Sequence, residues 1–436
     1  TRRDLAPDAR PWFALGRAHA IGLVSSLVAV WGTQTEHIQT GRTYRRQPMS
    51  DGILTDERMV FVERMAALGP DFAARAAGYD RDASFPYENW DDLKQAGFLE
   101  LCVPKSAGGW GADFVAYALV AEELGRHCAT TALTFNMHSA TAMLAGFISD
   151  ELELEPEMLA ELDRRRPELW RGILEDRLIH SQPFSEGVAP GAVAGVGTRA
   201  VPVDGGYRVT GRKIFASLSG AANIHNVLAL VEGDPAMRLI GIPADAEGVR
   251  IEGDWDPLGM RGTDSRNLIM DDVFVPLGNE WIPPGVFDAM VRRFPYFYMT
   301  LSFAYLGLMR AILDETRSYL SGSSGVEARR DNHVKQAGWA KMQLTYERAQ
   351  SVTYRVLGEV GTDPNKDQLR RAWVAMVTTM EGAPEVASLA IQVCGGRSML
   401  RPNKLEQHYR DARCGATMLP WSVEVCIDRL GRAGLY

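Results

Sequence analysis

The order of hydrophobic and polar positions divides the chain into three parts. From about residue 54 to 150, segments such as "ENWDDLKQAGFLEL" (88–101) and "FVAYALVAEELGRH" (114–127) repeat apolar residues at spacings of three and four, which indicates amphipathic helices. Residues 151–180 extend this pattern as a polar helix, with Pro156 and Pro167 as expected breaks. The pattern predicts an all-α N-terminal domain over residues 49–180.

The periodicity changes between residues 181 and 283. Short β-rich runs separated by glycine and aspartate follow one another, among them "GYRVTGRKIFAS" (206–217), "HNVLALVEG" (225–233) and "RNLIMDDVFVP" (266–276). Short, evenly spaced strands of this kind predict a middle β-sandwich or β-barrel domain.

After Pro283 the helical period returns and continues to the C-terminus. Long helices are expected at 287–321, 333–360 and 367–394, and a shorter one near 420–432. The predicted fold class is therefore α+β multidomain: an N-terminal all-α domain, a middle β domain, and a four-helix-bundle-like C-terminal domain over residues 284–436.

Composition excludes some classes of protein. With 46% hydrophobic residues, 23% charged residues and a net charge of -8, the 436-residue chain has the composition of a large globular core and no excess of basic charge. We therefore expect no nucleic-acid or membrane partner. Five cysteines without metal-like spacing are interpreted as free thiols of a cytoplasmic protein, with no metal site. Residues 1–48, with seven arginines against three acids, are expected to be a poorly ordered extension.

Two stretches in the β region could contact a ligand. The glycine-rich "SEGVAPGAVAGVGTRA" (185–200) lacks the strand-turn-helix frame of a Rossmann site, so an ordinary β-turn is the simpler interpretation. In "GRKIFASLSGAAN" (211–223), Phe215 and Ser217 would share one face of a strand. That pair suits a flat heterocycle, although a strand with a buried Phe is the more common case.

Three features of the helical regions have simple structural interpretations. In "QVCGGRSM" (392–399), Gly395 and Gly396 fit a helix C-cap, and close approach to a ligand is the alternative. In "HYRDAR" (408–413), Arg410 and Asp411 are expected in a loop, as a structural ion pair. His138 on an apolar helix is expected to be a core histidine.

Taken together, these stretches resemble the acyl-CoA dehydrogenase family of flavoproteins. The N-terminal "FPYENWDDLKQAGFLELCVPKSAGGWGAD", "SEGVAPGAVAGVGTRA", "GYRVTGRKIFASLSGAAN", "LGMRGTDSRNLIMDDVFVP" and "IQVCGGRSM" with "LEQHYRDAR" match family motifs in the same order. The resemblance covers roughly residues 55–432.

The resemblance implies a flavin between the β domain and the C-terminal domain, with an adjacent subunit completing the site in a homo-oligomer, a dimer or tetramer. It implies FAD, an acyl-CoA substrate, a role in fatty acid metabolism, and an electron-transfer flavoprotein as partner. The cofactor-binding residues that it implies are Gln182, Ser185, Gly187, Gly191, Phe215, Ala216, Ser217, Gln392, Gly395 and Gly396.

The sequence departs from the family pattern where the catalytic base is expected. Dehydrogenation of a thioester needs a carboxylate to remove the α-proton while hydride leaves for flavin N5. The two positions from which the family supplies this glutamate are Leu419 and Phe297 here. Glu424 is the nearest acid after Leu419, and it is the predicted base.

Three hypotheses follow. The first is α,β-dehydrogenation of an acyl thioester with Glu424 as a displaced base. The second is a flavin-dependent monooxygenase of the same fold, which uses O2 and reduced flavin, FMN or FAD, from a flavin reductase and needs no such base. It is supported by "GSSG" (322–325), which stands where the family has an Arg and a Phe that hold the FAD dinucleotide. The third is a non-catalytic protein that acts through its subunit interfaces.

Overall fold

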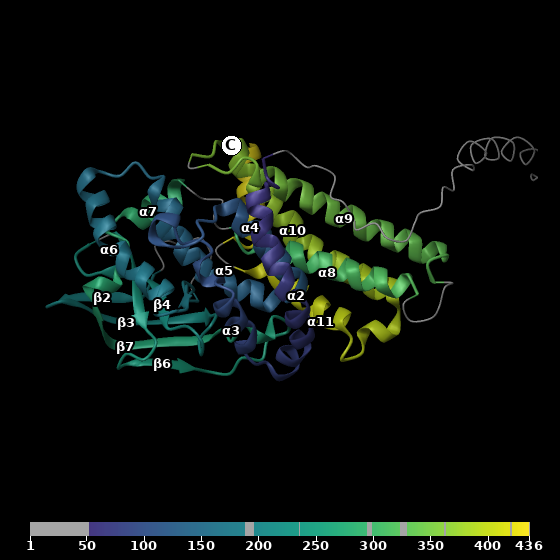
Figure 1. The fold of residues 1–436 in the computed structure, drawn as a ribbon, viewed down its shortest axis with the longest axis horizontal. Helices are drawn as coiled ribbons and strands as arrows, with labels where there is room; N and C mark the ends of the chain where they lie inside the picture. Colours follow the sequence, from purple (N-terminus) through teal and green to yellow (C-terminus); the bar gives the residue numbers. More distant parts are fainter. Residues whose placement is uncertain are drawn as a thin grey trace, which may run out of the picture. The chain divides into compact units, whose positions relative to one another are not determined.

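The computed structural model describes residues 52–187, 196–234, 236–293, 299–322, 329–361, 363–418 and 421–435 (Figure 1). The expectation for residues 1–48 lies outside this range. The fold class predicted from the sequence is confirmed: a helical N-terminal part, a middle β part and a helical C-terminal part follow one another along the chain.

The N-terminal part is helical, as the apolar spacing predicts. Its α-helices are α2 (Asp56–Asp82), α3 (Tyr87–Gln95), α4 (Phe114–His127), α5 (Ala129–Met143) and α6 (Pro156–Leu174). Asp113 caps α4, since its side chain accepts a hydrogen bond of 2.8 Å from the Ala116 N–H. The break expected at Pro167 is wrong, because α6 continues through this proline. Ion pairs within the helix, Arg164 with Glu161 and Arg171 with Glu168, support the turns on either side.

The middle part forms one seven-stranded sheet. Its strands are β1 (His180–Ser181), β2 (Arg199–Val203), β3 (Gly206–Ala216), β4 (Ile224–Val231), β5 (Met237–Pro243), β6 (Val249–Glu252) and β7 (Arg266–Pro276). The order is β1-β4-β2-β3-β7-β6, and β5 pairs with β4. Long β3 pairs antiparallel with both β2 and β7, so it runs through the centre of the sheet.

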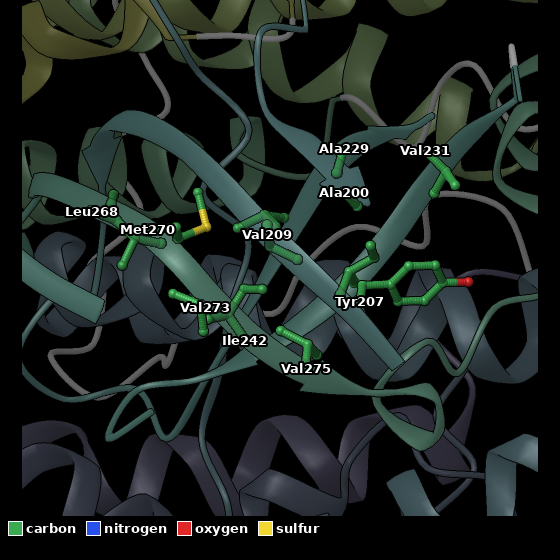
Figure 2. Packing of buried hydrophobic residues seen from close by; sticks show 13 residues of the cluster. Ala200, Tyr207, Val209, Ala229, Val231, Ile242, Leu268, Met270, Val273 and Val275 are labelled. Atoms are coloured by element: carbon green, nitrogen blue, oxygen red, sulfur yellow. The ribbon is translucent and has the colours of Figure 1, made fainter. Parts of the chain in front are cut away.

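Alternate residues of these strands form an apolar core on one face of the sheet (Figure 2). Because side chains alternate along a strand, Tyr207 and Val209 of β3 and Val273 and Val275 of β7 enter this cluster at a spacing of two. Its members are Ala200, Tyr207, Val209, Ala216, Val227, Ala229, Val231, Ile240, Ile242, Leu268, Met270, Val273 and Val275.

The C-terminal part contains α7 (Val286–Arg293), α8 (Ser302–Leu320), α9 (His333–Leu357), α10 (Lys366–Cys394), α11 (Lys404–Cys414) and α12 (Val423–Leu435). The single helix expected at 287–321 is wrong, since α7 and α8 are separate. Pro295, in the run between them, lacks the N–H that a continuous helix requires. The loop expected around Arg410 and Asp411 is also wrong, because both lie in α11, which Asn403 caps.

Close helix packing joins the N-terminal and C-terminal parts. A Cβ atom added to Gly125 of α4 would lie 2.4 Å from the backbone carbonyl oxygen of Ala304 in α8. One added to Gly307 of α8 would lie 2.0 Å from the backbone carbonyl oxygen of Glu122 in α4. Only glycine allows these backbones to come so close. The neighbouring helix α5 contacts both α8 and β1, which places the start of the sheet against the helices. In the described residues, no helix is both long and apolar enough to cross a membrane.

Candidate active site

The turn predicted to contact a cofactor, residues 182–187, lies beside the end of β3. The Ile214 N–H donates a hydrogen bond of 2.8 Å to the Ser185 carbonyl, although the two residues are far apart in sequence. Gln182 anchors the start of the turn by donating to Thr141 Oγ1 at 3.2 Å. Gly187 has a φ of 78°, and a Cβ atom there would lie 3.4 Å from Ile214 Cδ1. The structure therefore brings Ser185 and Gly187 to the strand that carries Phe215 and ties Gln182 to α5, whereas Gly191 lies outside the described residues.

A buried ion pair fixes this turn to the sheet. Lys213 on β3 is fully buried and pairs with Glu186, whose side chain is only 7% exposed. The Glu186 carboxylate also accepts from Thr198 Oγ1 at 2.6 Å and from the Gly197 N–H. Burial alone would raise the pKa of Glu186, but Lys213 and the hydrogen bonds from Thr198 and Gly197 outweigh it and lower the pKa. The carboxylate is therefore charged and fully used in holding the turn.

The segment of Phe215, Ala216 and Ser217 is not a regular strand, so the expectation that strand alternation alone aligns Phe215 with Ser217 is wrong. The register of β3 against β7 shifts between Lys213 and Ala216, and Ser217 follows the last residue of the strand. Ala216 is buried. Phe215 is 65% exposed and packs edge-on against Trp255, with ring centroids 6.2 Å apart. An aromatic side chain this exposed at a bulge is free to pack against a flat ligand.

Backbone strain is concentrated in two segments that face each other. Seven non-glycine residues have positive φ in the described part of the chain, and four of them are Phe215, Leu218, Met260 and Asp264. The Leu218 N–H donates to the Thr263 carbonyl at 3.0 Å, so the two segments are hydrogen-bonded. Each such residue costs on the order of 1 kcal/mol, and strain of this kind tends to occur at ligand sites. The cluster therefore supports a ligand-binding role for this corner of the β domain.

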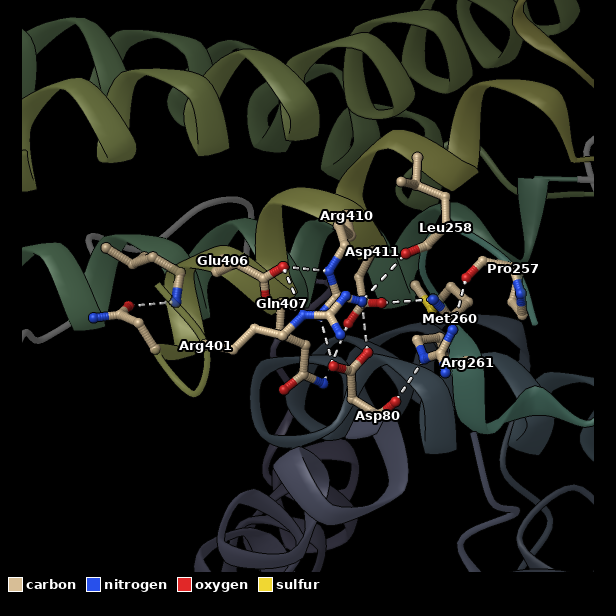
Figure 3. Close-up of polar contacts among 12 residues, drawn as sticks. Asp80, Pro257, Leu258, Met260, Arg261, Arg401, Glu406, Gln407, Arg410 and Asp411 are labelled. Atoms are coloured by element: carbon tan, nitrogen blue, oxygen red, sulfur yellow. Dashed lines mark hydrogen bonds and ion pairs between the residues drawn. The ribbon is translucent and has the colours of Figure 1, made fainter. Parts of the chain in front are cut away.

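Beside these strained segments, helix α11 connects all three parts of the chain (Figure 3). Arg410 makes a bidentate ion pair with Asp80 of α2, at 2.8 and 2.6 Å, and a second pair with Glu406, at 2.7 Å. Its guanidinium also donates to the Leu258 carbonyl, which precedes the strained segment, at 3.2 Å. Arg410 is thus structural, as expected, but its partners are Asp80 and Glu406 and not its neighbour Asp411.

Asp411 instead binds the backbone of the β domain. The Met260 N–H donates a hydrogen bond of 2.6 Å to Asp411 Oδ1, and a Cβ atom at Gly259 would lie 2.4 Å from the Arg410 carbonyl oxygen. Burial raises the pKa of Asp411 to about 7, with Asp80 adding to the effect and the Met260 N–H opposing it. No sequence pattern predicts this contact, since "RDAR" and "LGMRGTDS" lie about 150 residues apart.

The start of the turn rests on a buried polar cluster. His138 donates from Nε2 to the Leu99 carbonyl at 3.0 Å and accepts the His180 N–H at 3.2 Å, so it is the core histidine that the sequence predicts. Burial lowers the pKa of His138 to about 4 and that of His180 to about 3. Asn226 donates to the carbonyl of Ser181 at 3.0 Å. Both histidines are therefore neutral near pH 7 and serve to shape the backbone.

The remaining predicted site residues lie elsewhere. Gln392 and Gly396 are exposed at the end of α10, and the Gly395 carbonyl accepts locally from Ser398 Oγ at 2.7 Å. Gly395 has a φ of 79°, which confirms the C-cap. Glu424 is exposed in the first turn of α12. The two substituted base positions, Leu419 and Phe297, lie outside the described residues.

A helical part, a β sheet and a second helical part follow one another along the chain. Three family models match in sequence order: acyl-CoA dehydrogenase, N-terminal domain (residues 55–154), middle domain (184–273) and C-terminal domain (287–419). The chain belongs to the acyl-CoA dehydrogenase family.

Relatives in this family carry more than one type of name. "Putative acyl-CoA dehydrogenase YdbM" from Bacillus subtilis is 25% identical, over 84% of this chain and 94% of the relative. "L-evernosamine nitrososynthase" from Micromonospora is 25% identical, over 88% and 91%. The solved structure of KijD3 with FMN and a dTDP-linked amino sugar has a TM-score of 0.75 at 22% identity, and the match covers 88% of this chain and 94% of that one. The fold is therefore shared by proteins of different reaction types.

Proposed function

We propose that this protein is a flavin-dependent monooxygenase, which takes reduced flavin and O2 and oxidises a small-molecule substrate. The observation that carries the proposal is the state of the carboxylates around the candidate site. Removing an α-proton from a thioester requires an ionised carboxylate that can reach the substrate. Glu186 and Asp411 are engaged in structural contacts, and Glu424 is exposed at the start of α12.

Three acids are the relevant candidates. Glu186 is held by Lys213 and by the Thr198 hydroxyl. Asp411 is buried, and its carboxylate accepts a hydrogen bond from the Met260 N–H. Glu424, the predicted displaced base, is exposed in the first turn of α12. A monooxygenase needs none of these as an α-proton base, and the exposure of Glu424 favours this function over dehydrogenation with Glu424 as a displaced base.

The residues of the corner suit an isoalloxazine ring. Phe215 offers an exposed aromatic face, Ser217 a hydroxyl next to it, and the Ser185–Gly187 turn lies alongside. When bound, reduced flavin supplies the electrons that activate O2. The protein's part is to position the ring and substrate and to keep water away from them.

We propose FMN, or FAD held mainly through its flavin half, as the cofactor, and a separate flavin reductase as the partner. The Arg and Phe with which the family holds the dinucleotide are replaced by "GSSG" (322–325). The exposure of Gln392 and Gly396 leaves them available to the flavin of a neighbouring subunit, so the homo-oligomer expected from the resemblance forms part of this proposal.

Acyl-CoA dehydrogenation is the second candidate. The relative named as a putative acyl-CoA dehydrogenase, which this chain matches over most of its length, favours it. In that reaction Glu424 would act as the base and an electron-transfer flavoprotein would reoxidise the flavin.

Two experiments separate the candidates, the first of them anaerobic. For the second candidate, mixing the oxidised flavoprotein with acyl-CoA thioesters of several chain lengths should bleach the flavin, and Glu424→Gln should abolish the bleaching. For the proposed function, no thioester bleaches the flavin. Instead, adding O2 to the reduced complex with a substrate library should yield an oxygenated product detectable by mass spectrometry. Bleaching by a thioester that depends on Glu424 would refute the proposal.

A further inference from the structure

An unsatisfied indole N–H lies where α10 packs against α12. Trp373 of α10 is partly buried, and its Nε1 atom is closed off from solvent. Among the described residues, no group accepts a hydrogen bond from this N–H. Proteins normally pair a buried donor, because leaving it without an acceptor costs free energy. The Trp373 N–H therefore indicates a place where an acceptor from outside the chain can bind with a net gain.

A cation faces the same ring from α12. The guanidinium carbon of Arg429 lies 5.8 Å from the centre of the Trp373 ring, within range of a cation–π contact. In the part of the chain that the structure describes, Arg429 makes no ion pair or hydrogen bond. Arg432, one turn further along α12, differs in this respect, since it pairs with Asp428 at 3.0 Å. The donors of Arg429 are therefore available to a ligand.

The local sequence explains why Arg429 has no partner. Side chains three and four positions apart on a helix are neighbours, so a local ion pair would need an acid at one of these positions. On α12 these positions hold Val425, Cys426, Arg432 and Ala433. The equivalent neighbours of Trp373 on α10 are Leu369, Arg370, Met376 and Val377. The two facing helices thus offer donors and positive charge, and no carboxylate at these spacings.

This pair lies next to segments of the candidate active site. Trp373 packs edge-on against the buried Trp421, with ring centroids 6.4 Å apart. Trp421 stands two residues after Leu419, one of the positions from which the family supplies its base. Met376, one turn after Trp373 on α10, accepts a hydrogen bond of 3.0 Å from Ser302 at the start of α8. Trp373 is thus connected to segments that the resemblance places beside the substrate.

We propose that Arg429 and the Trp373 N–H bind the carboxylate of the substrate, which is a small organic acid with a flat or apolar body. A planar guanidinium pairs with both oxygens of a carboxylate, and the indole N–H can donate to one of them. The rings of Trp373 and Trp421 suit the body of such an acid. Because no ion pair holds Arg429 over the ring, its side chain can turn to admit the ligand. Carboxylate binding stands by itself, whereas its assignment to the substrate rests on the proposed function.

The test uses benzoate as the probe and benzamide as its uncharged counterpart. Dissociation constants would be measured by isothermal titration calorimetry on the whole protein at constant ionic strength. The wild type should bind benzoate about tenfold more tightly than benzamide, because only the carboxylate pairs with the guanidinium. Arg429→Gln should remove most of this preference. Trp373→Phe keeps an aromatic ring but removes the N–H, and should weaken benzoate binding by about fivefold.

Three further variants serve as controls. Arg432→Gln removes a neighbouring positive charge from α12 and should keep the wild-type affinity, which separates a specific contact from the general field of the helix. Arg429→Lys keeps the charge but not the planar fork, so it should retain only part of the affinity. Trp170→Phe removes a buried indole from α6 and should have no effect. If Trp373→Phe does not fold, Arg429→Gln gives the test at a partly buried position.

The outcomes separate this inference from the proposed function. Benzoate binding that Arg429→Gln and Trp373→Phe weaken, with Arg432→Gln unchanged, supports the inference. No benzoate binding, equal binding of benzamide, or full benzoate affinity in Arg429→Gln overturns it. These titrations need no flavin, so thioester bleaching that depends on Glu424 would refute the proposed function without altering them. In the oxygenation assay the compounds oxidised should be carboxylic acids, and oxidation only of compounds without a carboxylate would overturn the assignment to the substrate.

Discussion

Replacing Asp411 with asparagine should stabilise the protein at alkaline pH. The buried carboxyl has a pKa of about 7 in the folded chain, against 3.8 for an ordinary Asp. The folded state therefore holds a proton that the unfolded state has released between about pH 4 and pH 7. Because the folded state binds more protons in this window, stability falls as pH rises through it. Each unit of pKa difference corresponds to about 1.4 kcal/mol, so the ionised Asp411 lowers the free energy of unfolding above pH 7 by about 4 kcal/mol.

Asparagine retains the oxygen that accepts the Met260 N–H, at 2.6 Å in the wild type, but it carries no charge. Urea unfolding of wild type and Asp411→Asn would be measured at pH 5 and at pH 8.5. The variant should gain stability relative to wild type by about 2 to 3 kcal/mol between these two pH values. Asp428→Asn, which removes a carboxylate from the exposed surface of α12, serves as the control and should show a change within about 0.5 kcal/mol. If the difference in free energy of unfolding between Asp411→Asn and wild type does not vary with pH, or if the variant loses stability relative to wild type as pH rises, the raised pKa of Asp411 is refuted.

Three further substitutions test the site and its supports. Phe215→Ala should leave the thermal unfolding midpoint nearly unchanged, because the ring is 65% exposed, and should weaken FMN binding by about tenfold or more in a fluorescence titration. Equal FMN affinity in the variant would remove Phe215 from the site. Lys213→Met should destabilise the fold by about 3 kcal/mol in urea by leaving Glu186 buried and unpaired, and adding Glu186→Gln should restore most of the loss; no recovery in the double variant would contradict the pairing argument. Arg410→Lys should lower the free energy of unfolding by about 2 kcal/mol, because one ammonium group cannot replace the bidentate contact with Asp80. An unchanged midpoint of urea unfolding would mean that this contact does not stabilise the fold.

The sequence was sufficient for the architecture because periodicity reports how one face of an element is buried. Spacings of three and four predicted the helices that precede and follow the β region along the chain, and runs with a period of two predicted β3 and β7. It failed where periodicity was weak or interrupted. The mostly polar α11 has no clear apolar face from which it could be predicted, and the sequence pattern did not separate α7 from α8.

The motifs also located the candidate corner, because Ser185, Phe215 and Ser217 stand in stretches that resemble those of one family. The tertiary structure decided how these stretches meet. The Ile214–Ser185 hydrogen bond brings the turn to the strand, and the shift in register at Phe215 turns its ring outward. Such contacts depend on backbone conformation at single residues, which residue type alone does not fix.

The polar contacts of the interior were decided only by the fold. Asp411 and Met260 are 151 residues apart, and no sequence pattern marks their hydrogen bond. A sequence encodes which groups must be buried, since hydrophobicity is a property of each residue. Which donor then meets which acceptor is a matter of three-dimensional placement, and in this protein that placement gives Asp411 its raised pKa.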